Sequence, residues 1–399
     1  MADMIEQRAR PAAAGDIAQP ILGGVLAAAV GYASTFTLVL AGLAHVGATN
    51  GQQASGLFAL CIAMGVLNTI SAWRTRMPLT FAWSTPGAAF LLGLQPVEGG
   101  FPAVVGAFIV VGALVLATGL FRPLTRAIAA IPQAVASAML AGVLLELCLA
   151  PVHAVGEVPA LALPVLVAWV LGLRFARRFA VPIAVVVAAI AIGLSANVPP
   201  GAVTLTLPSL VPVMPVFTLN AVVQIALPLF VITMASQNLT GIAVMRANGY
   251  EVDPRVPFVA TGVASALIGI VGAVTVNLAA VSAAIAAGPE AHPDPARRWI
   301  AGFSVGVTYF VVAPLSSIVA AFIAASPAIL IQAVAGLALL PSLAASLAGS
   351  LASEEARLPA IVTFITTASG ITLLGIGGAF WGLVAGIGLM LVLRRWTPA

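Results

Sequence analysis

The chain has 399 residues, of which 61% are hydrophobic and only 7% are charged, and its formal net charge is +4. A mean hydropathy of +1.15 excludes a water-soluble globular domain of this length. Apolar runs recur to the C-terminus, so we predict an all-α polytopic membrane protein embedded in the lipid bilayer, with no room for a soluble catalytic domain. We expect no enzyme activity and no cofactor. The basic residues are too dispersed to indicate nucleic acid binding.

The arginines indicate how the chain crosses the membrane. All sixteen basic residues are arginines, and they lie in small clusters between the apolar runs. Cytoplasmic loops are enriched in positive charge, so we place every cluster in the cytoplasm, and each of the seven intervals between clusters then crosses the bilayer twice. The sequence therefore predicts fourteen spans with both termini in the cytoplasm, and no signal peptide in the polar tail 1–19.

The predicted spans form two halves of seven, separated by an extracellular loop at 199–218. The alternating sequence GAVTLTLPSLVPV in this loop is compatible with a short strand or hairpin. In chain order, the spans are expected near 20–44, 53–73, 79–95, 101–121, 127–149, 159–173, 179–196, 219–241, 257–272, 273–288, 299–324, 327–350, 358–370 and 373–393.

The two halves repeat each other in sequence. IPQAVASAMLAGVLL, which starts at Ile131, resembles SPAILIQAVAGLALL, which starts at Ser326, at an offset of roughly 195 residues. Such an internal duplication is typical of transporters. Because each half contains an odd number of spans, the two halves must have opposite orientations in the membrane. We therefore predict a 7+7 inverted repeat.

The third span, LTFAWSTPGAAFLL at 79–92, is interrupted in its middle. Strand-favouring residues precede Ser84-Thr85-Pro86-Gly87, and a short apolar helix follows, in which Pro86 suits the first turn. At the repeat offset, Val274-Thr275-Val276 likewise precedes Asn277 and a short apolar helix in the tenth span. Paired interrupted spans at matching places indicate a transport site, and the positive ends of two half-helices suit an anion.

Three motifs resemble the bacterial benzoate:proton symporter family. They are AWSTPGAAFLLG from Ala82, LPLFVITMASQNLTGIAVMRANGY from Leu227 and NLAAVSAAIAAGPEAHPDPARRW from Asn277. The resemblance covers nearly the whole chain, and the family is similar in fold to nucleobase and ascorbate transporters. It implies a core domain of spans 1–4 and 8–11, at 20–126 and 219–324. It also implies a gate domain of spans 5–7 and 12–14, at 127–198 and 325–399, and a homodimer in the bacterial inner membrane.

The resemblance also implies where the substrate binds. It places the site between the third-span break, the eighth span and the tenth span, at Ser84, Thr85, Pro86, Gly87, Ser236, Gln237, Asn238 and Asn277. The family often carries a histidine three residues before the tenth-span asparagine, and in this chain that position is Val274. The chain therefore lacks the side chain that a proton relay through this histidine would use.

Each of these positions also has a structural interpretation. The third-span break is compatible with a proline kink whose hydroxyls bond back to the helix, and Asn277 with a polar contact between helices. Gln237 and Asn238 fall on different helical faces, so one is expected to meet the substrate and the other the core domain. Phe81 and Trp83 are candidate contacts for an aromatic ring, or they pack against neighbouring helices.

Candidate groups for proton coupling are few. Glu146 is the acid that lies within an apolar span, and His45 lies at the outer end of the first span. The proton can also travel on the substrate itself. Neutral amides at the predicted site suit a substrate that carries its own negative charge. We expect no metal site, because the spacing of His292 and nearby acids is ordinary for a loop, where acids pair with Arg297 or Arg298.

The sequence thus favours a secondary active transporter that imports benzoate or a similar small aromatic carboxylate with protons, by an elevator-type motion of the core domain against the gate domain. The alternatives are a carrier of another anion or of a neutral nucleobase on the same fold, and a passive anion channel. Interrupted half-helices also occur in channels.

Overall fold

Helices occupy the apolar segments of the chain. The structure is a computed structural model that describes residues 14–121, 123–125, 132–195, 207–289, 291–324, 326–373 and 376–394. The elements of the first half are α2 (Ala14–His45), α3 (Asn50–Thr75), β1 (Phe81–Trp83), α4 (Thr85–Leu92), α5 (Gly100–Leu120), α7 (Gln133–Glu157), α8 (Pro159–Phe175), η1 (Arg177–Phe179) and α9 (Ala180–Ser195).

The second half continues after the central loop. Its elements are α10 (Leu219–Ala221), η2 (Val222–Ala226), α11 (Leu227–Thr233), η3 (Met234–Asn238), α12 (Leu239–Ala247), α13 (Arg255–Gly269), β2 (Val276–Leu278), α14 (Ala280–Ala287), η4 (Pro295–Arg297), α15 (Trp299–Val312), η5 (Ala313–Leu315), α16 (Ser316–Ala324), α17 (Ala328–Leu351), α18 (Arg357–Ala368), β3 (Thr372–Leu373), β4 (Ile376–Gly377) and α19 (Gly378–Arg394).

The lengths of these helices fit a membrane protein with many spans. Within the described residues, 7 helices are long and apolar enough to cross a membrane, one of them the continuous stretch Leu219–Ala247. Shorter apolar helices of 10–17 residues are α8, α9, α13, α18 and α19, while α4 and α14 have 8 residues each. A multi-pass membrane protein is therefore confirmed, and the full count of fourteen crossings stays a prediction.

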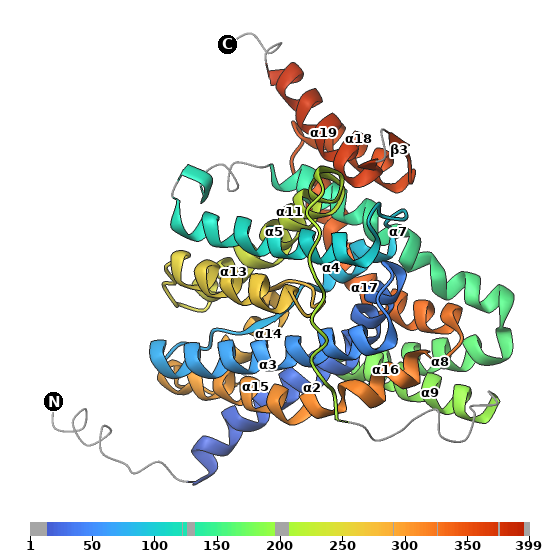
Figure 1. Cartoon of the computed structure of the whole chain (residues 1–399). Helices are drawn as coiled ribbons and strands as arrows, with labels where there is room; N and C mark the ends of the chain where they lie inside the picture. The colour runs from blue at the N-terminus through green and yellow to red at the C-terminus, as the bar shows by residue number, and fades with distance from the viewer. Residues whose placement is uncertain are drawn as a thin grey trace.

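The main helix pairs join the two halves of the chain. Helix α3 packs on α15, α5 packs on α13, and α7 packs on α17. Figure 1 shows α5 lying along α13 and α3 lying along α15. A Cβ atom at Gly112 of α5 would collide with the backbone of α13 at Ala266, and one at Gly262 of α13 would collide with the backbone of α5 at Leu116. These glycines let the two backbones approach closely, which stabilises helix pairs in lipid through van der Waals contact.

Replacing Gly262 by alanine should therefore destabilise the protein by about 1–3 kcal/mol, because the new methyl group meets main chain that cannot rotate away. Gly193→Ala is the matched control, since no atom lies within 4 Å of a Cβ at that position. Thermal unfolding of the purified proteins in detergent measures the difference. Equal melting temperatures for the two variants would contradict the close packing of α5 on α13.

The central loop does not form the expected hairpin where it is described. Residues 207–218 contain no strand, and residues 199–206 lie outside the described part. Instead its backbone N–H groups make single bonds to helix ends: Val213 donates to the carbonyl of Ile270, the C-cap of α13 (2.8 Å), and Val216 to the carbonyl of Pro102 in the first turn of α5 (3.0 Å). The three prolines of PSLVPVMP lack the donors that a strand ladder needs, so alternation of apolar residues was a poor guide here.

Candidate functional site

The interrupted segments of the two halves pair with each other. Strands β1 and β2 are antiparallel, with Ala82 opposite Asn277 and Trp83 opposite Val276. The half-helices α4 and α14 start within two residues of the strands' ends, as the sequence predicts for each segment separately. Their direct pairing was not predicted. It brings the starts of both half-helices to one place inside the bundle.

Where β1 and β2 cross, two side chains form hydrogen bonds with backbone groups at equivalent positions of the two strands. Phe81 donates its N–H to Asn68 Oδ1 (2.8 Å), and Asn68 Nδ2 donates to the Phe81 carbonyl (2.9 Å). On the other strand, Val276 donates its N–H to Ser265 Oγ (3.0 Å), which donates to the Val276 carbonyl (3.3 Å). Phe81 and Val276 are separated by the repeat offset. Non-helical backbone in a membrane is tolerated where its polar groups are bonded in this way.

The two half-helices differ in how their N-termini are capped. Ser84 is the N-cap of α4, where its Oγ accepts from the Gly87 N–H (3.1 Å), and Pro86 contributes no N–H. Ser84 thus caps the first turn of α4. In α14 the N-cap is Ala279, which makes no side-chain cap. Among the described residues, the first turn of α14 therefore has no side-chain cap on its N–H groups, whereas in α4 the Gly87 N–H is capped and Pro86 has none to offer.

The adjacent carboxamides Gln237 and Asn238 have different surroundings. Asn238 is 0% exposed, and its Oδ1 accepts from the Leu278 N–H of β2 (2.9 Å). Gln237 is partly exposed, and its side chain makes no hydrogen bond within the described part of the chain. Both lie in η3, a π-helical turn, which adds a residue to one turn of the helix and is frequent at functional sites.

A cavity of about 310 Å³ lies beside Gln237. We call it the candidate cavity. Its α4–η3–α14 wall consists of Pro86, Ile232, Ala235, Ser236, Gln237, Thr240 and Ala280, and its α7–α17 wall consists of Gln133, Ala136, Ser137, Leu140, Ser342, Ala345, Ser346 and Gly349. None of these side chains is charged, and none is aromatic. Ala280 belongs to the uncapped first turn of α14, so the cavity borders the N-terminus that retains its free N–H groups.

The predicted binding residues divide into lining and supporting positions. Pro86, Ser236 and Gln237 line the candidate cavity. Ser84, Asn238 and Asn277 are each 0% exposed behind its wall, and Thr85 and Gly87 do not line it. With its amide oriented to satisfy both groups, Asn277 accepts from the Ser84 N–H (3.1 Å) and donates to the Leu278 carbonyl (2.8 Å), which ties the two half-helix starts together.

The α7–α17 wall was missed by the sequence analysis. Its polar members are Gln133 and Ser137 on α7, and Ser342 and Ser346 on α17. A signal was present, because the last two are four residues apart in an apolar helix and so share one face. Without the packing of α7 on α17, nothing distinguished them from ordinary helical serines.

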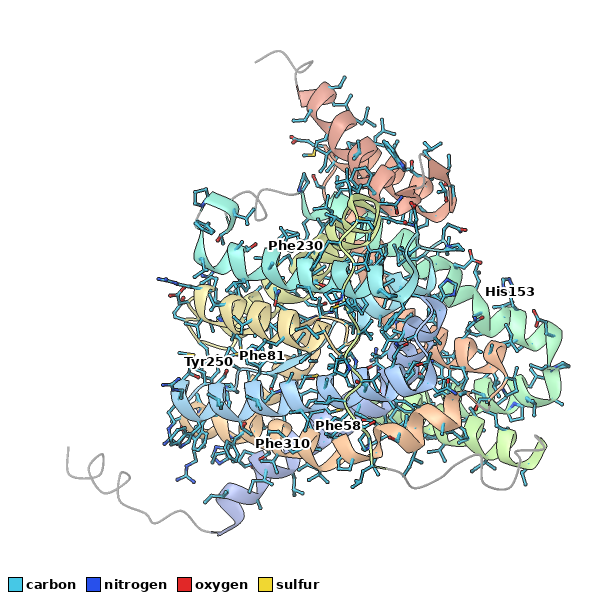
Figure 2. The ribbon with its side chains drawn as sticks, in the orientation of Figure 1. Phe58, Phe81, His153, Phe230, Tyr250 and Phe310 are labelled. Atoms are coloured by element: carbon cyan, nitrogen blue, oxygen red, sulfur yellow. The ribbon has the colours of Figure 1, made fainter. Side chains whose placement is uncertain are left out.

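The structure brings neither candidate aromatic side chain to the candidate cavity. Trp83 Nε1 donates to Thr35 Oγ1 (2.8 Å), and its ring lies 5.7 Å from that of Tyr32 and 6.2 Å from that of Tyr309. Phe81 is 1% exposed and lies among the helices of the bundle (Figure 2). Both side chains therefore pack against neighbouring helices, which was the alternative to a contact with the substrate ring.

The candidate proton-coupling residues lie together in a different place. His45 and Glu146 both line a second cavity of about 280 Å³, which shares no residue with the candidate cavity. Gln95 and Gln224 also line it, and His45 Nε2 is 2.9 Å from the Leu94 carbonyl oxygen. We call it the outer cavity, because the predicted topology puts the ends of these spans outside.

The loop that follows α14 is organised by a buried arginine. Arg298 donates from Nε to the His292 carbonyl (2.7 Å) and from its terminal nitrogens to the carbonyls of Ala287 (2.8 Å) and Pro293 (3.2 Å). The Ala287 bond neutralises the negative end of α14, the half-helix whose other end borders the candidate cavity. The predicted pairing of acids with arginines is confirmed at Asp294 and Arg297 (3.6 Å).

Tyr250 completes this loop. Its hydroxyl donates to the Pro295 carbonyl (2.8 Å). Partial burial raises the pKa of the Tyr250 phenol from its ordinary value, although the nearby Arg298 acts in the opposite direction. The phenol therefore stays protonated at neutral pH and keeps this hydrogen bond.

Three solved structures have the same fold. The transmembrane domain of a cyanobacterial bicarbonate transporter, BicA, matches 92% of this chain and 98% of its own, with a TM-score of 0.61 at 16% identity. SLC26A9 matches 94% of this chain and 65% of its own (TM-score 0.63, 11% identity). The murine Slc26a9 anion transporter in the inward-facing state matches 96% and 69% (TM-score 0.61, 12% identity). The chain thus shares the fold of these three solved structures.

Sequence comparison gives the family. Residues 16–392 match the family model of the benzoate membrane transport protein, and the chain belongs to this family. Inner membrane protein YdcO of Escherichia coli is 39% identical over 373 residues, covering 92% of this chain and 93% of that protein. The benzoate membrane transport protein of Acinetobacter baylyi is 26% identical over 369 residues, with the same coverage. The resemblance seen in the three motifs is confirmed, and the protein is a membrane transporter and not an enzyme.

Proposed function

We propose that the protein imports benzoate or a similar small aromatic carboxylate, together with protons, across the bacterial inner membrane. One observation carries the proposal: the uncharged candidate cavity borders the N-terminus of α14, which has no side-chain cap, and contains a carboxamide, Gln237, that makes no side-chain hydrogen bond among the described residues. Free helix N–H groups and an amide donor bind an anion without a compensating cation. An acidic side chain there would repel such a ligand.

The walls of the candidate cavity give each binding residue a role. The substrate carboxylate lies at the first turn of α14 and accepts from the Gln237 amide. Its ring contacts the apolar side chains Pro86, Ile232 and Leu140, which line the same cavity. Ser236 lines it too, although its hydroxyl already donates to the Ile232 carbonyl (2.6 Å). Ser84, Thr85, Gly87, Asn238 and Asn277 hold the two half-helix starts in place from behind.

The fourteen-span inverted repeat, with both termini in the cytoplasm, is part of this proposal. In this repeat α3 is equivalent to α13, α5 to α15, and α7 to α17. The repeat therefore requires that α5 pack on α13 as α3 packs on α15, and that α7 pack on its own equivalent α17, and these three pairs are in contact. Asn68 and Ser265 bind equivalent strand residues. The α4–η3–α14 wall then belongs to the core domain and the α7–α17 wall to the gate domain. Elevator motion of the core domain in a homodimer carries the substrate past the gate domain.

We place proton binding at the outer cavity, where His45 of the predicted core domain and Glu146 of the predicted gate domain meet. Val274, which stands where the family often has histidine, is 0% exposed and cannot carry a proton. Transport of the protonated acid itself is the alternative route.

Uptake by purified protein in liposomes tests the function. An inward proton gradient should drive concentrative, saturable accumulation of labelled benzoate, and excess unlabelled acid should abolish it. Failure to accumulate any aromatic acid would contradict the proposal. Benzoate uptake that never exceeds the external concentration identifies a passive channel. Saturable uptake of labelled uracil or bicarbonate that benzoate does not inhibit identifies a carrier of another substrate on the same fold.

A further inference from the structure

The α7–α17 wall of the candidate cavity is rich in hydroxyl groups. Ser137, Ser342 and Ser346 line it, together with the Gln133 amide. Ser342 and Ser346 lie one turn apart on α17, which packs on α7, the helix that carries Ser137. The opposite wall supplies Gln237 and the uncapped end of α14. The cavity therefore has polar groups on both sides and apolar side chains between them.

Among the described residues, these serines have no hydrogen-bond partner. At Thr69, Thr261 and Ser304, as in many membrane helices, the hydroxyl donates to the carbonyl four residues earlier, at 2.7–2.8 Å. Ser137, Ser342 and Ser346 make no such bond, nor any other, within the described part of the chain. Ser346 is only 6% exposed, so its side chain is more than nine-tenths buried and still lines the cavity. These hydroxyls open onto the candidate cavity, so their hydrogen-bond partner there is solvent or a bound ligand.

We propose that the preferred substrates are aromatic acids that carry a ring hydroxyl at the meta or para position, on the edge of the ring away from the carboxylate, rather than unsubstituted benzoate. The inference rests on the proposed function. With the carboxylate at α14 and Gln237, the far edge of the ring faces the α7–α17 wall. There a ring hydroxyl exchanges hydrogen bonds with Ser137, Ser342 and Ser346, whereas a bare or methylated ring leaves these groups unpaired. Sites that bond a substrate hydroxyl reject analogues without one.

Matched ligand pairs test this inference on the wild-type protein. Displacement of labelled benzoate from the protein in detergent is measured with 3-hydroxybenzoate against 3-methylbenzoate, and with 4-hydroxybenzoate against 4-methylbenzoate. Each pair has similar size and differs in polarity. We expect the hydroxyl compound to bind roughly 10-fold more tightly in at least one pair. Equal or tighter binding of the methyl compound in both pairs overturns the inference.

Variants assign the preference to the α7–α17 wall. In Ser342→Ala/Ser346→Ala the ratio of hydroxyl to methyl affinity should fall to near one, and each single variant should lower it. Ser304→Ala, on α15 and away from the cavity, should keep the wild-type ratio. An unchanged ratio in all three serine variants overturns the inference. Benzoate binding without hydroxyl preference refutes only this inference, whereas binding of no aromatic acid refutes the proposed function as well.

Discussion

Replacing Gln237 by glutamate should reduce benzoate binding at pH 8 roughly 100-fold without unfolding the protein. The two side chains have the same shape, and in the part of the chain that the structure describes the Gln237 side chain has no hydrogen bond to lose. An ionised carboxylate about 5 Å from a bound carboxylate costs roughly 3 kcal/mol at an effective dielectric constant of about 20. Isothermal titration with benzoate measures the loss, and thermal unfolding checks that the fold is intact.

Gln52→Glu is the matched control for this charge. Gln52 Oε1 accepts from the Thr49 N–H (2.8 Å) in a capping box at the start of α3, and a glutamate serves there equally well. The control adds the same charge away from the candidate cavity, so it should bind benzoate as the wild type does. Unchanged affinity in Gln237→Glu would show that the carboxylate binds elsewhere.

Replacing Asn68 by leucine should destabilise the protein by roughly 2–6 kcal/mol and abolish uptake. The side chain is 0% exposed and satisfies both the N–H and the carbonyl of Phe81. Leucine has similar volume but leaves both backbone groups unpaired inside the bundle, and each such group costs about 1–3 kcal/mol. Thermal unfolding in detergent and liposome uptake measure the two effects.

Asn248→Leu provides the comparison, because the Asn248 side chain donates only to the Val244 carbonyl within its own helix end (2.9 Å) and is half-buried. Its melting temperature should lie close to that of the wild type. A similar melting temperature for Asn68→Leu would mean that the β1–β2 crossing does not depend on this side chain.

The local form of the two interrupted segments was predictable from the sequence. Strand-favouring residues followed by Ser84 and Pro86 define an N-cap and a first helical turn, and these are short-range preferences that act within a few residues. The repeat offset then located β2 and α14. The capping difference between Ser84 and Ala279 is also visible in the sequence, once the offset aligns these two positions.

What the sequence left open depends on contacts between distant residues. The pairing of β1 with β2 joins residues about 195 positions apart, and no local preference specifies it. Gln237 and Asn238 lie in the π-helical turn η3 and have different surroundings. No particular residue types mark such a turn in a sequence. The α7–α17 wall became a candidate only through packing. In the central loop, prolines that forbid a strand ladder outweighed an alternating apolar pattern.

A structure of the protein bound to 3-bromobenzoate tests the central claim most directly, because the bromine can be located by its anomalous scattering. We expect one bromine peak in the candidate cavity, with the carboxylate at the first turn of α14 and at Gln237, and the bromine on the side of Ser346. A ligand in the outer cavity beside His45 and Glu146, with the candidate cavity free of it, would contradict the account.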